Sequence, residues 1–198
     1  MDLDVRIVAE VSQEDGESCK FTVDRVVLPE GCVRFTDKPR AQSSPLARRL
    51  FAVPGVAGVD IYGKTVMVRR SGSDTWRQVG PQIGTAIREH LRSGEPAVSP
   101  ETLRDRPEED KLRAAIDRIL NDQINPAVAS HGGAISLLDV HDGTVFLQMS
   151  GGCQGCASAS VTLRQGVEKT LREQVPGVGD IVDVSDHAAG TNPYFAAR

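Results

Sequence analysis

Aromatic side chains are scarce in this sequence, since Phe, Trp and Tyr make up only 4% of its 198 residues. A large aromatic binding platform is therefore not expected. The formal net charge is −4 and no block of basic residues occurs, whereas nucleic-acid binding needs a concentrated cationic face. No apolar run approaches the ~20 residues that span a bilayer. These absences argue against nucleic-acid and membrane partners.

The N-terminal stretch MDLDVRIVAEV also lacks targeting features. It has neither the basic start and apolar core of a signal peptide nor the Arg- and Ser-rich composition of a transit peptide. We therefore expect a cytoplasmic protein. In a reducing compartment a Cys-x-x-Cys pair binds metal or carries out redox chemistry more often than it forms a structural disulfide.

The clearest break in the sequence lies between Ser93 and Asp110. This stretch holds three prolines, many charges and almost no large apolar side chains. Such a composition cannot bury a core and is typical of a linker. We predict a first domain at residues 1–94, a linker at 95–107 and a second domain at 108–198, both domains within the usual size range.

The first half reads as a mixture of strands and helices. β-Branched and aromatic residues predict strands within residues 3–7, 20–28 and 31–35, and a hairpin over 56–70 that turns at Gly63-Lys64. A helix is predicted over 43–53, capped by Ser43 or Ser44. A second helix is predicted over 76–94, with a buried stripe and a glycine just past its end: Ile83, Ile87, Leu91 and Gly94.

The second half predicts the order helix, strand, strand, helix, strand. The first helix spans about residues 108–130, where Pro126 should bend or break it and Gly132 or Gly133 can end it. Residues 134–151 predict a hairpin with Asp142-Gly143 as the turn. A helix over 158–175 and a short strand within 176–184 follow. The fold class is therefore α+β, with two small α+β domains joined by the linker.

Cys153 and Cys156 have two residues between them in the stretch SGGCQGCASAS, residues 150–160. They lie between a predicted strand and a predicted helix. The unpaired N–H groups and partial positive charge of a helix N-terminus stabilise a thiolate there. The surrounding glycines let the backbone curl close to whatever the sulfurs hold. The pair therefore predicts a site for a soft metal or for thiol chemistry.

Four interpretations of this pair remain open. A thiol–disulfide oxidoreductase uses the same spacing, although its usual setting is the crossover helix of a β-α-β unit and an antiparallel hairpin precedes the pair here. A structural zinc site needs two more Cys or His ligands, and His131, His141 and His187 are scattered. The two residues can also be small buried hydrophobes. In the fourth interpretation a two-fold dimer brings two pairs face to face, and four thiolates suit an iron–sulfur cluster.

The second half carries four motifs: HGG at 131–133, GGC-x-G-C at 151–156, VTL-x-x-GVEK at 161–169 and DH-x-x-G-x-x-x-Y at 186–194. With these motifs it closely resembles the NifU C-terminal domain, in the form found in bacterial Nfu-type iron–sulfur carrier proteins. The match runs from about Lys111 to Phe195. Many members of the family have proline where this chain has Ala157, and its absence leaves the start of the helix less rigid.

This resemblance implies a [4Fe–4S] cluster that bridges two subunits of a homodimer. It assigns Cys153 and Cys156 of each subunit as the metal ligands and implies delivery of the cluster to apo-proteins. The partners implied are apo iron–sulfur clients and upstream assembly proteins, and no catalytic residue is required, so the chain is not expected to be an enzyme. The alternative is a thiol–disulfide oxidoreductase that uses the same pair.

The first half contains the pattern SPLA-x-x-LF-x-x-x-GV at 44–56. With this pattern it resembles the N-terminal domain of Nfu proteins, most strongly over residues 41–94, and the pattern favours that domain over a degenerate A-type carrier domain. The resemblance implies that the first domain provides no cluster ligand and contributes to the recognition of client proteins.

Three other sets of residues need an interpretation. Cys19 and Cys32 are expected to be ordinary small residues in strands, with an auxiliary metal or redox site as the alternative. His131 is expected to cap a helix end rather than to bind metal or carry a proton. Tyr194 and Phe195 either dock a client or fold back on the domain, and the sequence does not decide between these.

Overall fold

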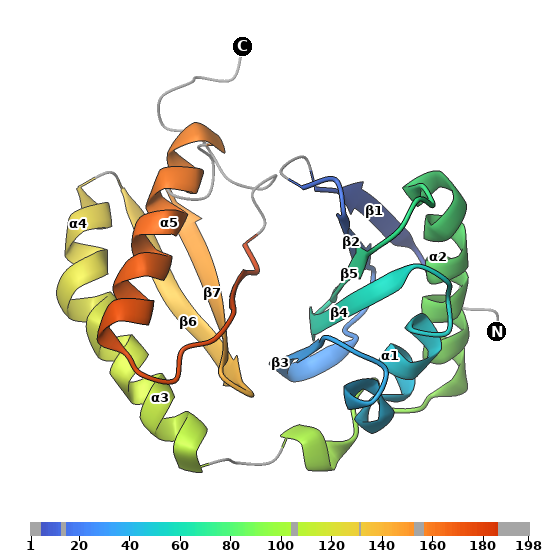
Figure 1. Ribbon diagram of the computed structural model, residues 1–198. Coiled ribbons are helices and arrows are strands. Elements are labelled where there is room, and N and C mark those ends of the chain that lie inside the picture. The colour runs from blue at the N-terminus through green and yellow to red at the C-terminus, as the bar shows by residue number, and fades with distance from the viewer. Residues whose placement is uncertain (1–4, 13–14, 104–106, 131, 153–156, 186–198) are drawn as a thin grey trace. The chain divides into compact units, whose positions relative to one another are not determined.

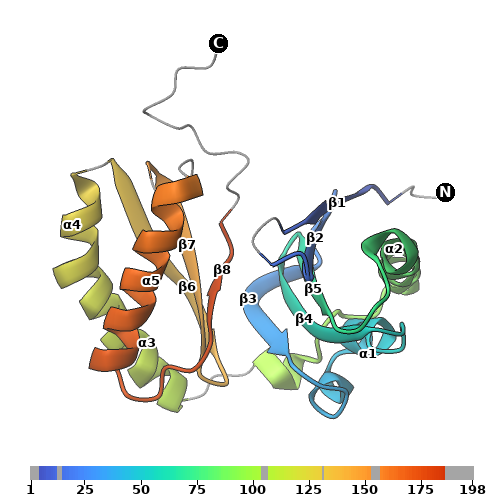
Figure 2. The same ribbon diagram turned by 45° about the horizontal axis from the view of Figure 1, so that its top comes forward.

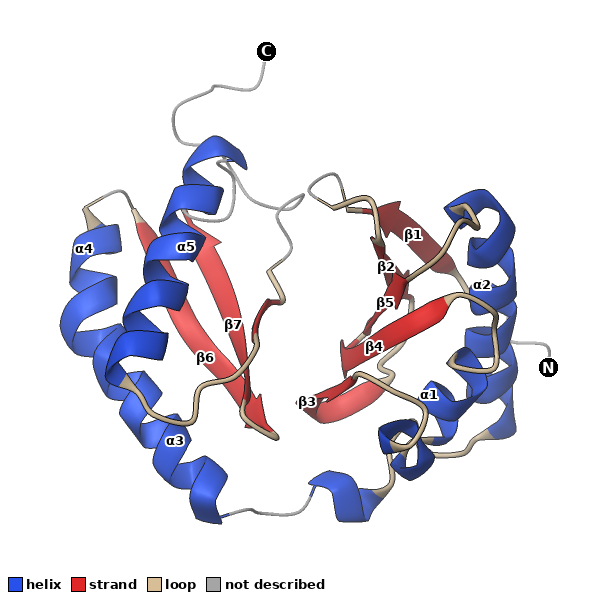
Figure 3. Cartoon of the chain, viewed as in Figure 1, coloured by secondary structure: helices blue, strands red, loops and turns tan. Residues whose placement is uncertain are grey.

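The computed structural model describes residues 5–12, 15–103, 107–130, 132–152 and 157–185. The chain divides into two compact units, residues 1–104 and 105–198. Each unit contains a β-sheet and helices (Figure 1; Figure 3). The predicted α+β class is therefore confirmed.

The first unit is built on a five-stranded antiparallel sheet in the order β1-β2-β5-β4-β3. The strands are β1 (Ile7–Val11), β2 (Ser18–Val23), β3 (Leu28–Phe35), β4 (Val56–Gly63) and β5 (Thr65–Arg70). The predicted hairpin is present, because β4 and β5 pair from Tyr62 and Thr65 onward.

Helices α1 (Pro45–Leu50) and α2 (Trp76–Ser93) cover one face of this sheet (Figure 1). Ser44 caps α1, because its hydroxyl accepts a 2.9 Å hydrogen bond from the Ala47 N–H. Gly94 ends α2 at a φ of 71°, as predicted, which suits a residue without a Cβ. Along α2, Ile83 and Ile87 are fully buried against the sheet and Leu91 packs at the margin of the same core.

The segment that follows α2 differs from the predicted linker over 95–107. Ala97 and Val98 belong to the core of the first unit. The Ser44 hydroxyl donates to the Ala97 carbonyl at 2.5 Å, and the Ser99 N–H donates to the Ser43 carbonyl at 2.9 Å. A short 3₁₀ helix, η2 (Pro100–Leu103), comes next. Two small apolar residues gave little sequence signal, but hydrogen bonds from the Ser44 hydroxyl and to the Ser43 carbonyl fix this stretch to the first unit.

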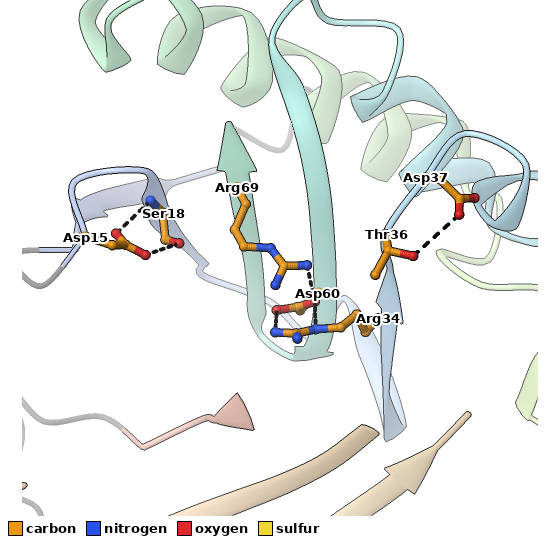
Figure 4. A network of polar contacts seen from close by, with 7 residues as sticks. All are labelled: Asp15, Ser18, Arg34, Thr36, Asp37, Asp60 and Arg69. Atoms are coloured by element: carbon orange, nitrogen blue, oxygen red, sulfur yellow. Dashed lines mark hydrogen bonds and ion pairs between the residues drawn. The ribbon is translucent and has the colours of Figure 1, made fainter. Parts of the chain in front are cut away.

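The other face of the first sheet holds a charged group of three residues. Arg34 on β3 makes two parallel hydrogen bonds to the carboxylate of Asp60 on β4, at 2.9 and 3.1 Å (Figure 4). Arg69 on β5 approaches the same carboxylate at 3.8 Å. The side chain of Asp60 is only 2% exposed. One buried carboxylate thus joins three neighbouring strands.

The second unit has a three-stranded sheet in the order β6-β7-β8. The strands are β6 (Gly133–His141), β7 (Thr144–Gly151) and β8 (Ile181–Asp183). Helices α3 (Pro107–Ile119), α4 (Asn125–Ala129) and α5 (Ala157–Gln174) lie along one face of this sheet (Figure 2). Its core joins residues from both layers, including Ile116, Leu120, Ile135, Leu147, Val167 and Leu171.

The predicted helix over 108–130 is present but is not continuous. A π-helical turn, η3 (Leu120–Ile124), separates α3 from α4, and the Asn125 N–H bonds to the Leu120 carbonyl five residues earlier. Pro126 has no N–H to donate within the helix, so a wider turn just before it is a physically reasonable way to continue. Pro126 was predicted to bend or break the helix; the structure instead shows a change of helical pitch just before it, and helical residues continue through it.

The β6–β7 hairpin turns at Asp142-Gly143, as predicted, with φ values of 49° and 74°. After α5 the chain returns to the sheet as β8, which pairs in parallel with β7. The parallel pairing was not predicted. It follows from the connection, since a strand reached through a crossover helix runs in the same direction as the strand before the helix.

Candidate functional site

The Cys-x-x-Cys pair lies in the connection between β7 and α5. Strand β7 ends at Gly151 and helix α5 begins at Ala157. The chain order therefore puts Cys153 and Cys156 at the predicted junction of a strand and a helix. Both cysteines lie outside the described residues, and the backbone that leads into them defines the surroundings of the site.

Two pairs of glycines meet directly before the first cysteine. Gly133 pairs with Gly151 in the β6–β7 ladder, and the Gly152 N–H donates to the Gly132 carbonyl at 2.9 Å. A Cβ on Gly151 would collide with that carbonyl oxygen. Gly151 also has a φ of 62°, which L-residues with a side chain rarely adopt. Only glycine allows the two backbone segments to come this close.

Gly132 also ends the preceding helix. Its φ is 69° and its N–H donates to the Ala129 carbonyl at 2.9 Å, so the predicted left-handed helix end is confirmed at this residue. One residue therefore both closes α4 and supplies the carbonyl that holds Gly152. The HGG motif and the GGC motif, which are about 20 residues apart in sequence, form one structural feature.

Helix α5 starts with Ala157, directly after Cys156, and runs for 18 residues. Its first N–H groups have no partner within the helix, and the helix dipole places partial positive charge at this end. Thiolates and the anionic clusters that they hold are stabilised in such a position. Glycines 132–133 and 151–152 form what we call the glycine cradle. Together with the two cysteine sulfurs, this cradle suits a soft metal ion or an anionic metal–sulfur cluster.

The β7–α5–β8 connection changes one argument from the sequence. A thiol–disulfide oxidoreductase typically carries its Cys-x-x-Cys at the start of a crossover helix between parallel strands. The preceding hairpin argued against that setting, but the parallel pairing of β7 with β8 creates it. The strand arrangement therefore no longer argues against the oxidoreductase, and other observations have to separate the two functions.

Cys19 and Cys32 are both buried, as expected for small residues in strands. Cys19 belongs to the core under α1 and α2, as do Val33 and Phe35 on β3. Because side chains alternate along a strand, Cys32 points to the opposite face of the sheet from Val33. Strands β5 and β4 also separate β2 from β3, a distance of about 14 Å at normal strand spacing. The two thiols therefore cannot bind one metal ion together.

Raising the pH from 9 to 11 should destabilise the first unit through Cys19. Burial raises the pKa of the Cys19 thiol from 9.0 to about 11. The unfolded thiol then ionises before the folded one, so the contribution is complete below pH 9 and is lost towards pH 11. It amounts to about 2 kcal/mol of unfolding free energy. Urea unfolding followed by the fluorescence of Trp76, the single tryptophan, measures the loss. In Cys19→Ala the decline should be shallower, and an equally steep decline would contradict this assignment.

Three other residues singled out in the sequence, His131, Tyr194 and Phe195, lie outside the described residues. Their roles stay predictions. Among the residues that the structure describes, no group of three or more His, Cys, Asp or Glu side chains could hold a metal ion.

Asn125 also belongs to this region, although the sequence motifs did not include it. Its side chain accepts a 2.8 Å hydrogen bond from the Ile135 N–H and donates a 2.9 Å bond to the Ile135 carbonyl. These bonds attach α4 to β6 two residues after the glycine pair. The only signal in the sequence was the Asn-Pro dipeptide, which by itself indicates a turn.

Both halves of the chain match known families. Residues 116–182 match a NifU-like domain, and residues 10–94 match the N-terminal domain of the Nfu/NifU scaffold protein. A NifU-like protein of Schizosaccharomyces pombe is 31% identical over 178 residues, which cover 84% of this chain and 68% of that protein. The chain belongs to the NifU-like family.

Two bacterial relatives of this NifU-like chain are named Fe/S biogenesis protein NfuA. The protein of Xanthomonas euvesicatoria pv. vesicatoria is 51% identical over 78 residues, covering 39% of each chain. That of Ectopseudomonas mendocina is 45% identical over 89 residues, covering 44% of this chain and 46% of the relative. The matched region thus spans less than half the length of either NfuA protein.

A solved structure of a NifU-like protein from Saccharomyces cerevisiae covers 50% of this chain and 91% of its own, at 19% identity and a TM-score of 0.45. That degree of likeness is too low to support a conclusion. No helix among the described residues combines the length and the apolar character needed to cross a membrane.

Proposed function

We propose that this protein carries or assembles a [4Fe–4S] cluster and transfers it to apo-proteins. Cys153 and Cys156 of two copies of the chain provide the four thiolates, so that the cluster bridges a homodimer. The observation that carries the proposal is the glycine cradle at 132–133 and 151–152, which leads the backbone directly into the Cys-x-x-Cys of a NifU-like domain.

The positions of the four cysteines support a site in which each chain provides half of the ligands. The chain has four cysteines, and two of them, Cys19 and Cys32, are buried on opposite faces of the first sheet. Each chain then offers one pair of sulfurs at the β7–α5 connection. A closed two-fold dimer is the simplest arrangement that brings two such pairs together.

Transfer requires only ligand exchange. A cysteine thiolate of the client forms a bond to iron while the bond from Cys153 or Cys156 breaks, and the released thiolate takes up a proton from solvent. The oxidation state of the iron does not change. No catalytic residue is needed, so the proposal describes a carrier and not an enzyme, in keeping with the biogenesis function named for the NfuA relatives.

Replacing Cys153 or Cys156 with serine should abolish cluster uptake. Anaerobic reconstitution with iron and sulfide should give the wild type a broad visible absorbance, four irons per two chains and a doubled solution mass. Each serine variant should lose most of the bound iron and remain at its apo mass. The double variant Cys19→Ala, Cys32→Ala is the matched control and should take up iron like the wild type. A serine variant that binds a full cluster would contradict the proposal.

The second candidate is a thiol–disulfide oxidoreductase, which the β7–α5–β8 crossover favours. It predicts a colourless protein that reduces or oxidises a model disulfide such as insulin. If the carrier proposal holds, the wild type should bind iron and absorb visible light, and it should neither reduce nor oxidise the model disulfide. Turnover by a protein that binds no iron would replace the carrier function with this one.

We propose that the first unit contributes to the choice of client proteins, as the match to the Nfu N-terminal domain suggests. The proposal places the domain boundary near residue 104, where the two compact units divide. We also propose a cytoplasmic location for the protein, as expected from the sequence.

A further inference from the structure

The region next to the proposed cluster site contains an amide side chain with an unusual pair of partners. The two hydrogen bonds of the Asn125 side chain go to a strand and not to its own helix. Its Oδ1 accepts from the Ile135 N–H and its Nδ2 donates to the Ile135 carbonyl, at 2.8 and 2.9 Å. A neighbouring β-strand would offer the same donor and acceptor. Asn125 therefore occupies the place of a strand beside the outer edge of β6.

The π-helical turn explains how a helical residue reaches this edge. The Asn125 N–H bonds to the Leu120 carbonyl, one residue further back than in an α-helix. A wider turn rotates the residues that follow relative to those before it. Pro126, next in the chain, has no N–H that would favour the regular turn. In this local geometry the Asn125 side chain bonds to Ile135 on β6.

From Ile135 the connection to the cysteines is short. Ile135 pairs with Met149, and Gly133 pairs with Gly151 two residues along the same ladder. Next to them, the Gly132 carbonyl accepts from the N–H of Gly152, the residue before Cys153. The first residues of β6 are thus held on one side by Asn125 and on the other by the strand that leads into the metal-binding segment.

We propose that Asn125 is a positioning residue for the Cys-x-x-Cys segment. By fixing the start of β6 to helix α4, it holds the Gly132 carbonyl where the Gly152 N–H can reach it. It thereby limits the freedom of the backbone that enters Cys153. Its importance for the cluster rests on the proposed function, whereas its effect on the Gly152 N–H does not.

Gln123, on the π-helical turn just before Asn125, offers a matched control. Its side-chain amide exchanges two hydrogen bonds with Gln174 on α5, at 2.8 and 2.9 Å. Gln123→Ala therefore removes the same number of amide hydrogen bonds as Asn125→Ala. The lost bonds join η3 to α5, and none of them involves β6.

The direct test is amide hydrogen exchange in the full-length apo-protein, followed by NMR at Ile135 and Gly152. In Asn125→Ala, exchange should quicken about tenfold at Ile135 and severalfold at Gly152. In Gln123→Ala both rates should stay within about twofold of the wild type. If Asn125→Ala does not fold, Asn125→Asp keeps the acceptor for the Ile135 N–H and should quicken exchange at Gly152 by a smaller factor. Unchanged exchange at Gly152 in the variant that folds would overturn the proposal.

A second measurement uses the loaded protein. Iron release to a chelator, followed by visible absorbance, should be severalfold faster for Asn125→Ala than for the wild type and for Gln123→Ala. Equal release rates for all three proteins would show that Asn125 has no effect on the cluster. If the wild type binds no cluster at all, the proposed function fails, while the exchange rate at Gly152 still decides the positioning role.

Discussion

Replacing Gly151 with alanine should destabilise the second unit by at least about 3 kcal/mol, among the largest effects expected of one methyl group. A Cβ at this position meets the carbonyl oxygen of Gly132, and both groups belong to the backbone, so neither can rotate away. The φ of 62° adds the strain of a left-handed conformation. The strand pair would have to separate just before Cys153. Chemical denaturation followed by far-UV circular dichroism should therefore show an earlier transition for this unit.

Gly132→Ala is the matched control for this change. Gly132 has nearly the same φ, 69°, but a Cβ there meets nothing within 4 Å. Only the conformational strain applies, so the loss should be about 1 kcal/mol. The fluorescence of Trp76, which reports on the first unit, should be unaffected by either variant. Equal losses in the two variants would show that the contact with the Gly132 carbonyl is not the cause.

Replacing Asp60 with alanine should lower the stability of the first unit by about 3 kcal/mol. The change leaves the guanidinium groups of Arg34 and Arg69 side by side without the carboxylate that separates them (Figure 4). Removal of one partner from a buried pair costs far more than the pair itself contributes, because a desolvated charge stays behind. Urea unfolding followed by Trp76 fluorescence measures the loss.

Two variants define the contribution of burial in this experiment. Glu95→Ala removes the exposed pair with Arg49, whose side chains are 38% and 48% exposed, and should cost no more than about 0.5 kcal/mol. Gly58→Ala places a Cβ 2.6 Å from the Arg69 guanidinium and should displace only that flexible side chain, leaving the Arg34–Asp60 bonds intact. A loss for Asp60→Ala no greater than for Glu95→Ala would mean that the group is effectively solvated.

Local chemistry made much of the fold predictable from the sequence. Ser44 caps α1, Gly94 ends α2 and Asp142-Gly143 turns the second hairpin, because each depends on a few neighbouring residues. The apolar stripe of α2 was predicted equally well, since apolar residues that recur about every four positions favour a helix over a strand.

Features that depend on distant partners were not predictable in the same way. The stretch at 97–99 resembles a linker in composition, but hydrogen bonds to Ser43 and Ser44 and the burial of Ala97 and Val98 attach it to the first unit. The parallel pairing of β8 depends on the path of α5 across the sheet. Asn125 could not be recognised because its partner, Ile135, lies ten residues further along the chain on β6, and local sequence does not show that the two meet.

The candidate site likewise has features that could be predicted from local sequence and features that could not. The spacing of Cys153 and Cys156 and the glycines around them were sufficient to predict thiol or metal chemistry. The joining of the HGG and GGC motifs into one cradle required the register of β6 with β7. The pairing register of β6 with β7 thus brings the glycines of two short motifs together directly before Cys153.

The Asn125 side chain has a further consequence for how copies of this chain can associate. An outer strand with open N–H and C=O groups is a template on which other chains can add strands and aggregate. At Ile135 both groups are already occupied by Asn125. A second copy therefore cannot extend the sheet at this point of β6, so the Asn125 side chain protects the start of this outer strand from edge-to-edge association.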